Sequence, residues 1–300
     1  MNLEWRIIDT GEREGSFNTA IDVALLESVG NNESKPAIVM TEWKPTVSLG
    51  NSQSYFLDVD EKACKKHNVQ VVRRRSGGQA VFLDNNYFVF SVIAKPDMFP
   101  KDLTLLRKWF CNMVVEMLTD YDVPVEFYQP DNIVIRNGDK FRTIGNSGQV
   151  ITSKAIAVHG SVRYSLKNLD VMTDVLKVNG QKLQQFEDEI KDILGDVTSH
   201  NPNIAKKDLK TAFVTHFAEK YSAKYIRDNL KDSEIDKINA IASDLTKNVA
   251  REDRYKSRGV CYFFLNGQNL VPSLQQFLPY NTPSLWQESV VQIERDENGI

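Results

Sequence analysis

The stretch Val71-Val72-Arg73-Arg74-Arg75-Ser76-Gly77-Gly78-Gln79-Ala80-Val81-Phe82 determines how this chain folds and which ligand it selects. A short β-rich run leads into three arginines and a glycine pair, and a second apolar run follows. Glycines permit close backbone approach to an anion, and successive N–H groups in such a turn form an anion-binding concavity. Arginine adds a fork that matches carboxylate or phosphate geometry. The residues predict a phosphate or carboxylate ligand at a strand end; the alternative is a solvated basic hairpin.

Three familiar nucleotide and hydrolase motifs are missing from the sequence. It has no G-x-x-x-x-G-K-[ST] loop and no G-x-G-x-x-G fingerprint, so neither a P-loop nor a dinucleotide-binding half is indicated. The run Gly145-Asn146-Ser147-Gly148 does not fit the G-x-S-x-G nucleophile elbow.

Composition bounds the class of protein. The chain has 300 residues, of which 41% are hydrophobic and 26% charged, and its formal net charge is −3. This is a globular composition, and the length predicts one large domain or one large domain with a small one. The near-balance of charge predicts no broad nucleic-acid or membrane partner, although it leaves room for one basic groove.

Cysteine and histidine usage points to a reducing compartment. The three cysteines, Cys64, Cys111 and Cys261, form no C-x-x-C pair, and the four histidines lack zinc-ligand spacing. The start at Met1 lacks the basic and apolar pattern of a signal peptide, and no apolar run reaches the roughly 18 residues that span a membrane. The sequence therefore predicts a cytoplasmic protein without a disulfide or structural zinc framework.

Hydrophobic periodicity predicts an α+β fold with a mixed β-sheet flanked by helices and a smaller helical C-terminal region. Ser16 is the expected N-cap of the first helix and Gly30 its stop, and Asn137-Gly138 predicts a hairpin. The expected helices cover residues 16–29, 101–118, 183–194, 207–221 and 233–247. The expected strands cover residues 37–40, 46–49, 69–73, 80–83, 87–94, 125–127, 132–135, 140–144 and 155–162, with a further β-like run at 259–265 and loop in the last twenty residues.

The chain resembles the lipoate–protein ligase and octanoyltransferase family of the biotin/lipoate ligase superfamily. Within that family, its sequence is most similar to lipoate–protein ligase A-like proteins. Residues 73–84 resemble its R-R-x-[ST]-G-G-x-A-V-x-x-D signature. Further matching segments occur in family order at residues 5–11, 17–22, 43–53, 131–135, 145–147 and 159–161. The resemblance covers about residues 3–220 and is specific when the segments are taken together.

The resemblance implies a catalytic domain over residues 1–222 and a small accessory region over 223–300. In the ligases of this family, lipoate and ATP form lipoyl-adenylate, usually with Mg²⁺. The ε-amine of a lysine on a lipoyl-domain protein then attacks the adenylate; the acceptors are of the glycine cleavage H protein and 2-oxoacid dehydrogenase E2 type. Some members need an accessory domain or subunit for adenylation.

The resemblance also implies roles for individual residues. Arg73 and Arg74 would border the acyl carbonyl and phosphate, and Asp131 would help to hold Mg²⁺. The other expected substrate or adenylate contacts are Ser76, Gly77, Gly78, Gln79, Val81, Phe82, Asn132, Gly145, Asn146, Ser147, His159 and Gly160. The alternative interpretation of His159 is a strand histidine satisfied by backbone partners.

The sequence departs from the family pattern at the position of its lysine. Arg142 stands three residues before Gly145, where the family carries lysine. Arginine stays protonated, so it can clamp an acyl-adenylate but is a poor base. Lys140 lies two residues earlier and on the same strand face, so we expect Arg142 and Lys140 to be the catalytic cations, with Lys154 a weaker substitute. The Asp131-Asn132 order is also inverted relative to the family.

Three functions follow from the resemblance. The first is an ATP-dependent lipoate–protein ligase, and the second is an octanoyltransferase that uses an acyl-carrier donor. The cysteine-dependent transferases of the family carry their nucleophile in the loop before Asn132, and residues 125–130 contain no cysteine. Because this cysteine is absent, the ATP-dependent ligase is the preferred hypothesis from the sequence. The third is a non-catalytic binder of lipoyl domains or acyl-adenylate, which gains support if Lys140, Lys154 and Arg142 all point away from a common cleft.

Overall fold

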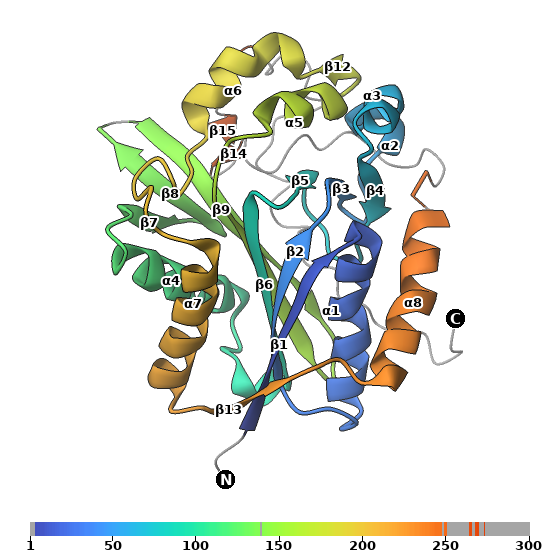
Figure 1. Ribbon diagram of the computed structural model, residues 1–300, viewed down its shortest axis with the longest axis vertical. Helices are drawn as coiled ribbons and strands as arrows, with labels where there is room; N and C mark the ends of the chain where they lie inside the picture. Colours follow the sequence, from blue (N-terminus) through green and yellow to red (C-terminus); the bar gives the residue numbers. More distant parts are fainter. Residues whose placement is uncertain are drawn as a thin grey trace.

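A mixed β-sheet runs through the centre of the molecule (Figure 1). The computed structural model describes residues 4–138, 140–247 and 249–250, together with 264–265, 268–269 and 273. Within these residues the sheet has eight strands, in the order β13 (Lys224–Asp228), β1 (Glu4–Arg13), β2 (Ala37–Trp43), β6 (Tyr87–Ala94), β10 (Ile156–Arg163), β9 (Lys140–Ile151), β8 (Asn132–Asn137) and β7 (Val125–Tyr128). The pairs β13–β1 and β1–β2 are parallel, and the others are antiparallel.

Helices cover both faces of this sheet because successive strand residues point to opposite sides. On β1, Ile7 packs with the helices α4 (Leu103–Thr119) and α7 (Lys206–Tyr221), whereas its neighbour Ile8 packs with α1 (Gly15–Gly30) and α8 (Asp232–Lys247). Figure 1 shows the two helix pairs on opposite sides of the sheet. Each face thus has its own apolar core, which fixes α1 against the strands.

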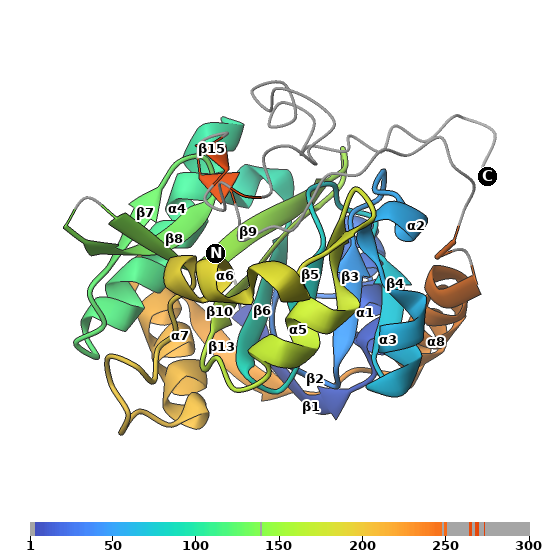
Figure 2. The ribbon, with the colours of Figure 1, turned by 90° about the horizontal axis from the view of Figure 1, so that it is seen from above.

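A second, smaller sheet lies against this layer and carries the arginine–glycine stretch. Its order is β4 (Gln70–Arg73), β3 (Thr46–Leu49) and β5 (Val81–Leu83), with β3–β4 parallel and β3–β5 antiparallel. Figure 2 shows this sheet beside α1, with short helices around it. The remaining elements are α2 (Tyr55–Asp58), α3 (Glu61–Lys66), η1 (Pro96–Met98), α5 (Leu169–Val175), β11 (Lys177–Val178), β12 (Gln181–Lys182), η2 (Gln184–Phe186), α6 (Glu187–Ile193), β14 (Phe264–Leu265) and β15 (Gln268–Asn269).

The α+β fold with a helix-flanked mixed sheet is confirmed, and so are the hairpin at Asn137-Gly138 and the stop of α1 at Gly30. The Ser16 N-cap is wrong, because α1 begins at Gly15. The amide N–H of Ser16 instead donates to Oε1 of Gln70 at 2.7 Å, so a side chain from β4 takes the place of a cap. The predicted helix over 183–194 is a 3₁₀ turn followed by α6, and β9 extends seven residues beyond the predicted strand, to Ile151.

The described C-terminal segment is attached to the main sheet. β13 extends the sheet beyond β1, and α8 packs on α1 through Ile238 and Leu245. The β-like run at residues 259–265 lies outside the described residues except for β14, and the last twenty residues lie outside them altogether. Within the described residues, no helix is both long enough and apolar enough to cross a membrane.

Candidate functional site

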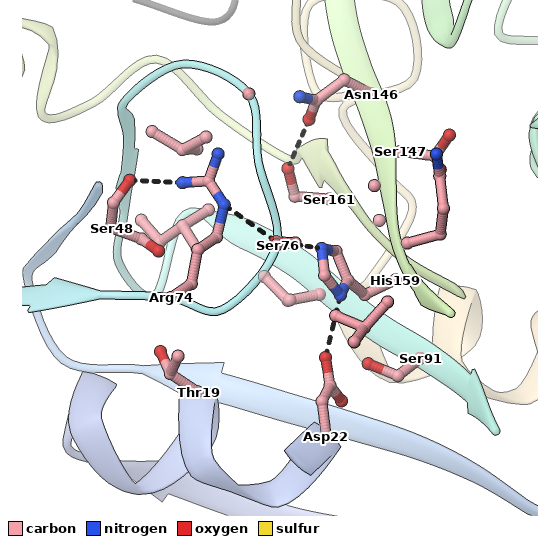
Figure 3. Close-up of a pocket in the computed structure, with 18 of the residues that line it drawn as sticks. Thr19, Asp22, Ser48, Arg74, Ser76, Ser91, Asn146, Ser147, His159 and Ser161 are labelled. Carbon is pink, nitrogen blue, oxygen red and sulfur yellow. Dashed lines mark hydrogen bonds and ion pairs between the residues drawn. The ribbon is translucent and has the colours of Figure 1, made fainter. Parts of the chain in front are cut away.

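A cavity of about 140 Å³ lies where α1, the small sheet and the strands β9 and β10 meet. We use "arginine loop" for residues 73–79, which close one side of it. Figure 3 shows side chains from α1, the arginine loop and the two long strands converging on this space. The cavity is therefore built by segments that are distant in the sequence and are brought together by the two sheets.

The cavity has an apolar portion and a polar portion. The apolar part of the lining consists of Val23, Trp43, Val81, Leu83, Val89 and Val150. The polar part comes from the arginine loop, α1 and the central strands. An apolar wall with a few convergent polar groups is the usual form of a site that binds a small organic group and fixes its orientation.

The three successive arginines have different surroundings. Arg73 is buried and outside the cavity lining, and its guanidinium donates to the backbone oxygens of Gly50, Asn51, Gln53 and Val249. Arg74 and Arg75 both line the cavity, and Arg75 also approaches the Glu27 carboxylate at 3.9 Å. The buried arginine is thus followed directly in the chain by two arginines that line the cavity.

Arg74 holds the arginine loop in shape. It donates to the backbone oxygens of Ser48, Gly77 and Gln79 at 2.6 to 2.7 Å. Its Nε donates to Oγ of Ser76 at 3.1 Å. A fixed cation therefore lies beside the Ser76 hydroxyl inside the cavity.

Ser76, His159 and Asp22 form a chain of hydrogen bonds across the cavity (Figure 3). Nε2 of His159 lies 3.3 Å from Oγ of Ser76, and Nδ1 of His159 lies 3.0 Å from the Asp22 carboxylate. A carboxylate only accepts hydrogen bonds, so the neutral imidazole carries its proton on Nδ1 and Nε2 is left as an acceptor. The hydroxyl of Ser76 can therefore donate its proton to Nε2 of His159 while its oxygen accepts from Nε of Arg74.

A glycine opposite His159 makes room for its ring. Gly148 on β9 is the strand partner of His159 on β10. A Cβ at Gly148 would lie 2.7 Å from Nε2 of His159, which is closer than side chains approach one another. Any larger residue at this position would displace the imidazole from Ser76.

Two buried oxygen atoms of α1 have no hydrogen-bond partner within the described residues. They are Oδ1 of Asn18 and Oγ1 of Thr19, and both residues line the cavity. The amide nitrogen of Asn18 is held by the backbone oxygen of Glu42 at 2.8 Å. Because buried polar groups are normally paired, these oxygens are suited to a ligand that brings N–H donors.

Asp131 lies on the β9 side of the cavity. Burial raises the pKa of its carboxyl group to about 6, although the charge of Arg107 partly opposes the shift. Asn132 donates to Oδ1 of Asp131 at 3.2 Å. The described residues contain no group of three or more His, Cys, Asp or Glu side chains that suits a metal ion. The role of Asp131 in holding Mg²⁺ stays a prediction, and such an ion would take most of its oxygen ligands from elsewhere.

The two described cysteines are poor nucleophiles. Burial raises the pKa of both Cys64 and Cys111 to about 12, so each is a neutral thiol near neutral pH. Cys111 lies behind the cavity wall, where its Sγ is 3.5 Å from Oγ of Ser147. Neither Cys64 nor Cys111 lines the cavity.

The structure gathers most of the residues expected from the sequence around this cavity. Those that line it are Arg74, Ser76, Gly77, Gly78, Gln79, Val81, Asp131, Asn132, Asn146, Ser147, His159 and Gly160. Three other expected binding residues, Arg73, Phe82 and Gly145, lie outside the lining. Phe82 is buried in the core beneath the small sheet, and Gly145 packs against the backbone of Ser161.

The expected catalytic cations Arg142 and Lys140 are exposed and lie outside the cavity lining. Nε of Arg142 donates to the backbone oxygen of Asp192 in α6. Lys154 is also exposed, and its Nζ contacts Oδ1 of Asn31 at 3.2 Å. Within the described part of the chain, no lysine lines the cavity.

Sequence reasoning gave no role to Asp22, Asn18 or Thr19, all of which α1 presents to the cavity. The available signal was Asp22 itself, an acid in the otherwise apolar run from Ala20 to Leu26. A carboxylate on a helix that packs into a core needs a partner, and here the partner is His159.

Known proteins resemble this chain over most of its length. A family model described as the lipoyl protein ligase A/B catalytic domain matches residues 14–218. The octanoyltransferase LipM of Carboxydothermus hydrogenoformans is 26% identical over 273 residues, which cover 85% of this chain and 97% of that protein. The octanoyltransferase LipM of Staphylococcus epidermidis is 23% identical, over 86% of this chain and 98% of that protein.

Solved structures share the fold. The bipartite lipoate protein ligase of Thermoplasma acidophilum, described with its E2 lipoyl domain, superposes with a TM-score of 0.72 at 19% identity, covering 85% of this chain and 99% of that chain. A lipoate-protein ligase A bound with ATP superposes with a TM-score of 0.65 at 21% identity, covering 84% of this chain and 98% of that chain.

Proposed function

The chain belongs to the lipoyl protein ligase A/B catalytic-domain family, and we propose that it is an octanoyltransferase. It moves an octanoyl group from a carrier-bound thioester to the ε-amine of a lysine on a lipoyl-domain protein. This is the second function derived from the sequence, and it now takes precedence over the ATP-dependent ligase.

One observation carries the proposal: relatives named octanoyltransferase align with this chain over almost their whole length, 97% in one case and 98% in another. The likeness therefore includes the strands and helices that enclose the cavity as well as the arginine loop. The ligase structures, at 19% and 21% identity, support the fold only.

The cavity suits an acyl group whose reacting end is polar. The apolar side chains, among them Val81 and Val89, can accept the hydrocarbon chain, and the carbonyl would lie toward Arg74 and Ser76. The unpartnered oxygens of Asn18 and Thr19 suit amide N–H groups of the carrier's arm or the amine of the acceptor.

The adenylating ligase finds less support in the same cavity. The family carries a lysine at the position of Arg142, yet Lys140, Lys154 and Arg142 all lie outside the lining; their placement also favours the third function, the non-catalytic binder. The described residues also supply only a sparse oxygen donor set for Mg²⁺ around Asp131. A reaction that starts from an activated thioester needs neither adenylation nor the metal.

The experiment compares the two donors directly. One reaction contains octanoyl-carrier protein and a lipoyl-domain protein without ATP, and the other contains lipoate, MgATP and the same acceptor. Intact mass spectrometry of the acceptor is the readout. The proposal expects octanoylation from the carrier alone, lost in Arg74→Ala and retained in Arg142→Ala.

Modification that requires ATP would reject the proposal in favour of the ligase. An acceptor unchanged in both reactions would support the third function, a non-catalytic binder, if the protein still binds the lipoyl domain.

A further inference from the structure

We propose that Ser76 is the nucleophile that carries the octanoyl group between donor and acceptor, with His159 as its base and Asp22 as the positioning residue. The inference deepens the proposed octanoyl transfer and rests on it. It starts from the hydrogen-bond chain Asp22–His159–Ser76, which the reaction as described so far does not use.

The proton arrangement prepares Ser76 for attack. Nδ1–H of His159 donates to the Asp22 carboxylate at 3.0 Å, which leaves the Nε2 lone pair facing Oγ of Ser76 at 3.3 Å. Nε of Arg74 donates to the same oxygen at 3.1 Å, and the hydroxyl of Ser76 can donate its single proton to His159. An acid–imidazole–hydroxyl series of this kind is the arrangement that activates serine in acyl transfer.

The electrostatics favour negative charge on the serine oxygen. The guanidinium of Arg74 is fixed beside it by the backbone oxygens of Ser48, Gly77 and Gln79. Such a preorganised cation stabilises the charge that develops when the proton leaves. The His159 and Asp22 side chains are largely buried, with exposed fractions of 22% and 18%, so bulk water screens the pair little.

In the first step, the carbonyl carbon of the octanoyl thioester bonds to Oγ of Ser76 while its bond to the carrier's sulfur breaks. The hydroxyl proton passes to Nε2 of His159 and from there to the departing thiolate. The products are an octanoyl ester on Ser76 and a free carrier thiol.

In the second step, the neutral ε-amine of the acceptor lysine bonds to the same carbonyl carbon, and the bond from that carbon to Oγ of Ser76 breaks. One amine proton passes to Nε2 of His159 and returns to the serine oxygen. The products are an octanoyl amide on the acceptor and the original hydroxyl, so no further reactant is consumed.

The described cysteines do not compete for this role. Cys64 lies in the core beneath the small sheet, and Cys111 is enclosed between α4 and β9, and neither lines the cavity. Residues 125–130, which form β7 and the start of the turn before Asn132, contain no cysteine. Ser76 is the cavity hydroxyl that has both a base and a cation within hydrogen-bond distance.

The test traps the covalent intermediate. The full chain is incubated with octanoyl-carrier protein without acceptor, quenched in acid, and analysed by intact mass and peptide mapping. We expect one octanoyl group on Ser76, stable to hydroxylamine at neutral pH and removed under alkaline conditions, as an oxygen ester behaves. In Ser76→Cys, we expect an adduct that neutral hydroxylamine removes, as it removes a thioester.

Two further variants separate catalysis from folding. Ser76→Ala should form no adduct and should lower acceptor octanoylation by about 10³-fold or more. Ser165→Ala is the control, because Ser165 is also a buried serine, hydrogen-bonded to Asn86 outside this cavity. It should keep both the adduct and the transfer rate. Thermal unfolding of both variants checks that each is folded.

The outcomes distinguish the two proposals. Octanoylated acceptor with no adduct on Ser76 and with full activity in Ser76→Ala would overturn the nucleophile and leave the transferase standing. An adduct on a cysteine would overturn it as well. An adduct on Ser76 with no transfer to any lipoyl domain would reject the proposed function and keep the acyl-serine, and a chain that takes no octanoyl group and transfers none rejects both.

Discussion

Arg73 and Arg74 differ in function although they are adjacent, because successive residues at a strand end point to opposite sides. Arg73 binds four backbone oxygens that come from residues 50, 51, 53 and 249, and it fixes the arginine loop to the protein. Arg74 shapes the loop from within and keeps its charge at Ser76. Of these two adjacent arginines, Arg73 therefore has a structural role, and Arg74 places its charge in the cavity.

Asp22→Asn tests the positioning of His159. The amide keeps the size of the carboxylate but does not hold the imidazole proton on Nδ1, so we expect kcat for octanoyl transfer to fall by about 10²- to 10⁴-fold. KM for the carrier should change by less than about two-fold, because Asp22 contacts the base rather than the chain. The control is Asp120→Asn, which alters another His–Asp pair, with His216, outside the cavity. Equal loss in both variants would contradict the assignment.

Asp131→Asn tests how much the ionisation of a buried carboxyl group in the cavity wall lowers the stability of the protein. Burial raises the carboxyl pKa from 3.8 to about 6, so the folded state resists ionisation and wild-type stability falls as pH rises through that window. The asparagine variant cannot ionise. Between about pH 4.5 and about pH 7.5, its free energy of unfolding should rise relative to wild type by about 2 kcal/mol. Urea unfolding at both pH values measures this, with the exposed Asp188→Asn as the control; a pH-independent difference would contradict the raised pKa.

At the scale of elements, the cavity depends on the close approach of the arginine loop to the end of β3. Gly50 follows β3 directly, and a Cβ on it would lie 2.0 Å from the backbone oxygen of Gly78. Backbone cannot yield as a flexible side chain does, so the loop keeps its position only with glycine at this site.

Gly50→Ala should therefore move the arginine loop and separate Ser76 from His159. We expect octanoyl transfer to fall by about 10²-fold or more, because a displacement of about 1 Å misaligns reacting groups. The control is Gly180→Ala, since a Cβ there meets nothing within 4 Å. The φ of +82° at Gly180 adds backbone strain to this variant, but the residue is not part of the cavity lining. Initial rates and thermal unfolding of both variants are the readouts. Wild-type transfer by Gly50→Ala would show that the loop position is not critical.

The elements that the sequence predicts correctly are those whose residue pattern lies within a single short segment of the chain. The apolar spacing of residues 16–29 predicts α1, and the Arg-Gly run predicts a turn between β4 and β5. β13 was not predicted because its residues are almost all exposed and have no alternation. Asp22 was not assigned because its partner His159 lies 137 residues away, and only the assembled sheet reveals the pair.

At the scale of the whole molecule, one buried arginine joins β1, near the start of the described chain, to β13 and α8. Arg6 on β1 donates to Glu234 of α8 at 2.6 Å and to Asp228 of β13 at 2.6 Å. The side chains of Arg6 and Glu234 are only 2% and 3% exposed. The sheet thus holds α8 against α1, the helix that presents Asp22.

Glu234→Ala should destabilise the protein by about 3–5 kcal/mol, because it leaves Arg6 buried with a partner lost. Burial acts to raise the pKa of Glu234, but the hydrogen bonds and charges of Arg6 and Lys231 outweigh it, so the pKa is lowered. The stabilisation that Glu234 provides is therefore present above the pKa of Glu234 in the unfolded chain. It is lost as the pH falls through the pKa of Glu234 in the folded protein. Glu33→Ala, which removes an exposed pair with Lys237, should have little effect. Denaturant unfolding of the two variants compares them, and similar stabilities would contradict the anchoring role.

A crystal structure with an unreactive octanoyl amide analogue of the carrier thioester tests whether octanoyl transfer takes place in the cavity between α1 and the arginine loop. We predict the hydrocarbon chain against Val81 and Val89, with the amide carbon within about 3.5 Å of Oγ of Ser76 and its oxygen near Arg74. An analogue bound outside this cavity, with its amide group beside Arg142 on the β8–β9 hairpin, would contradict the account.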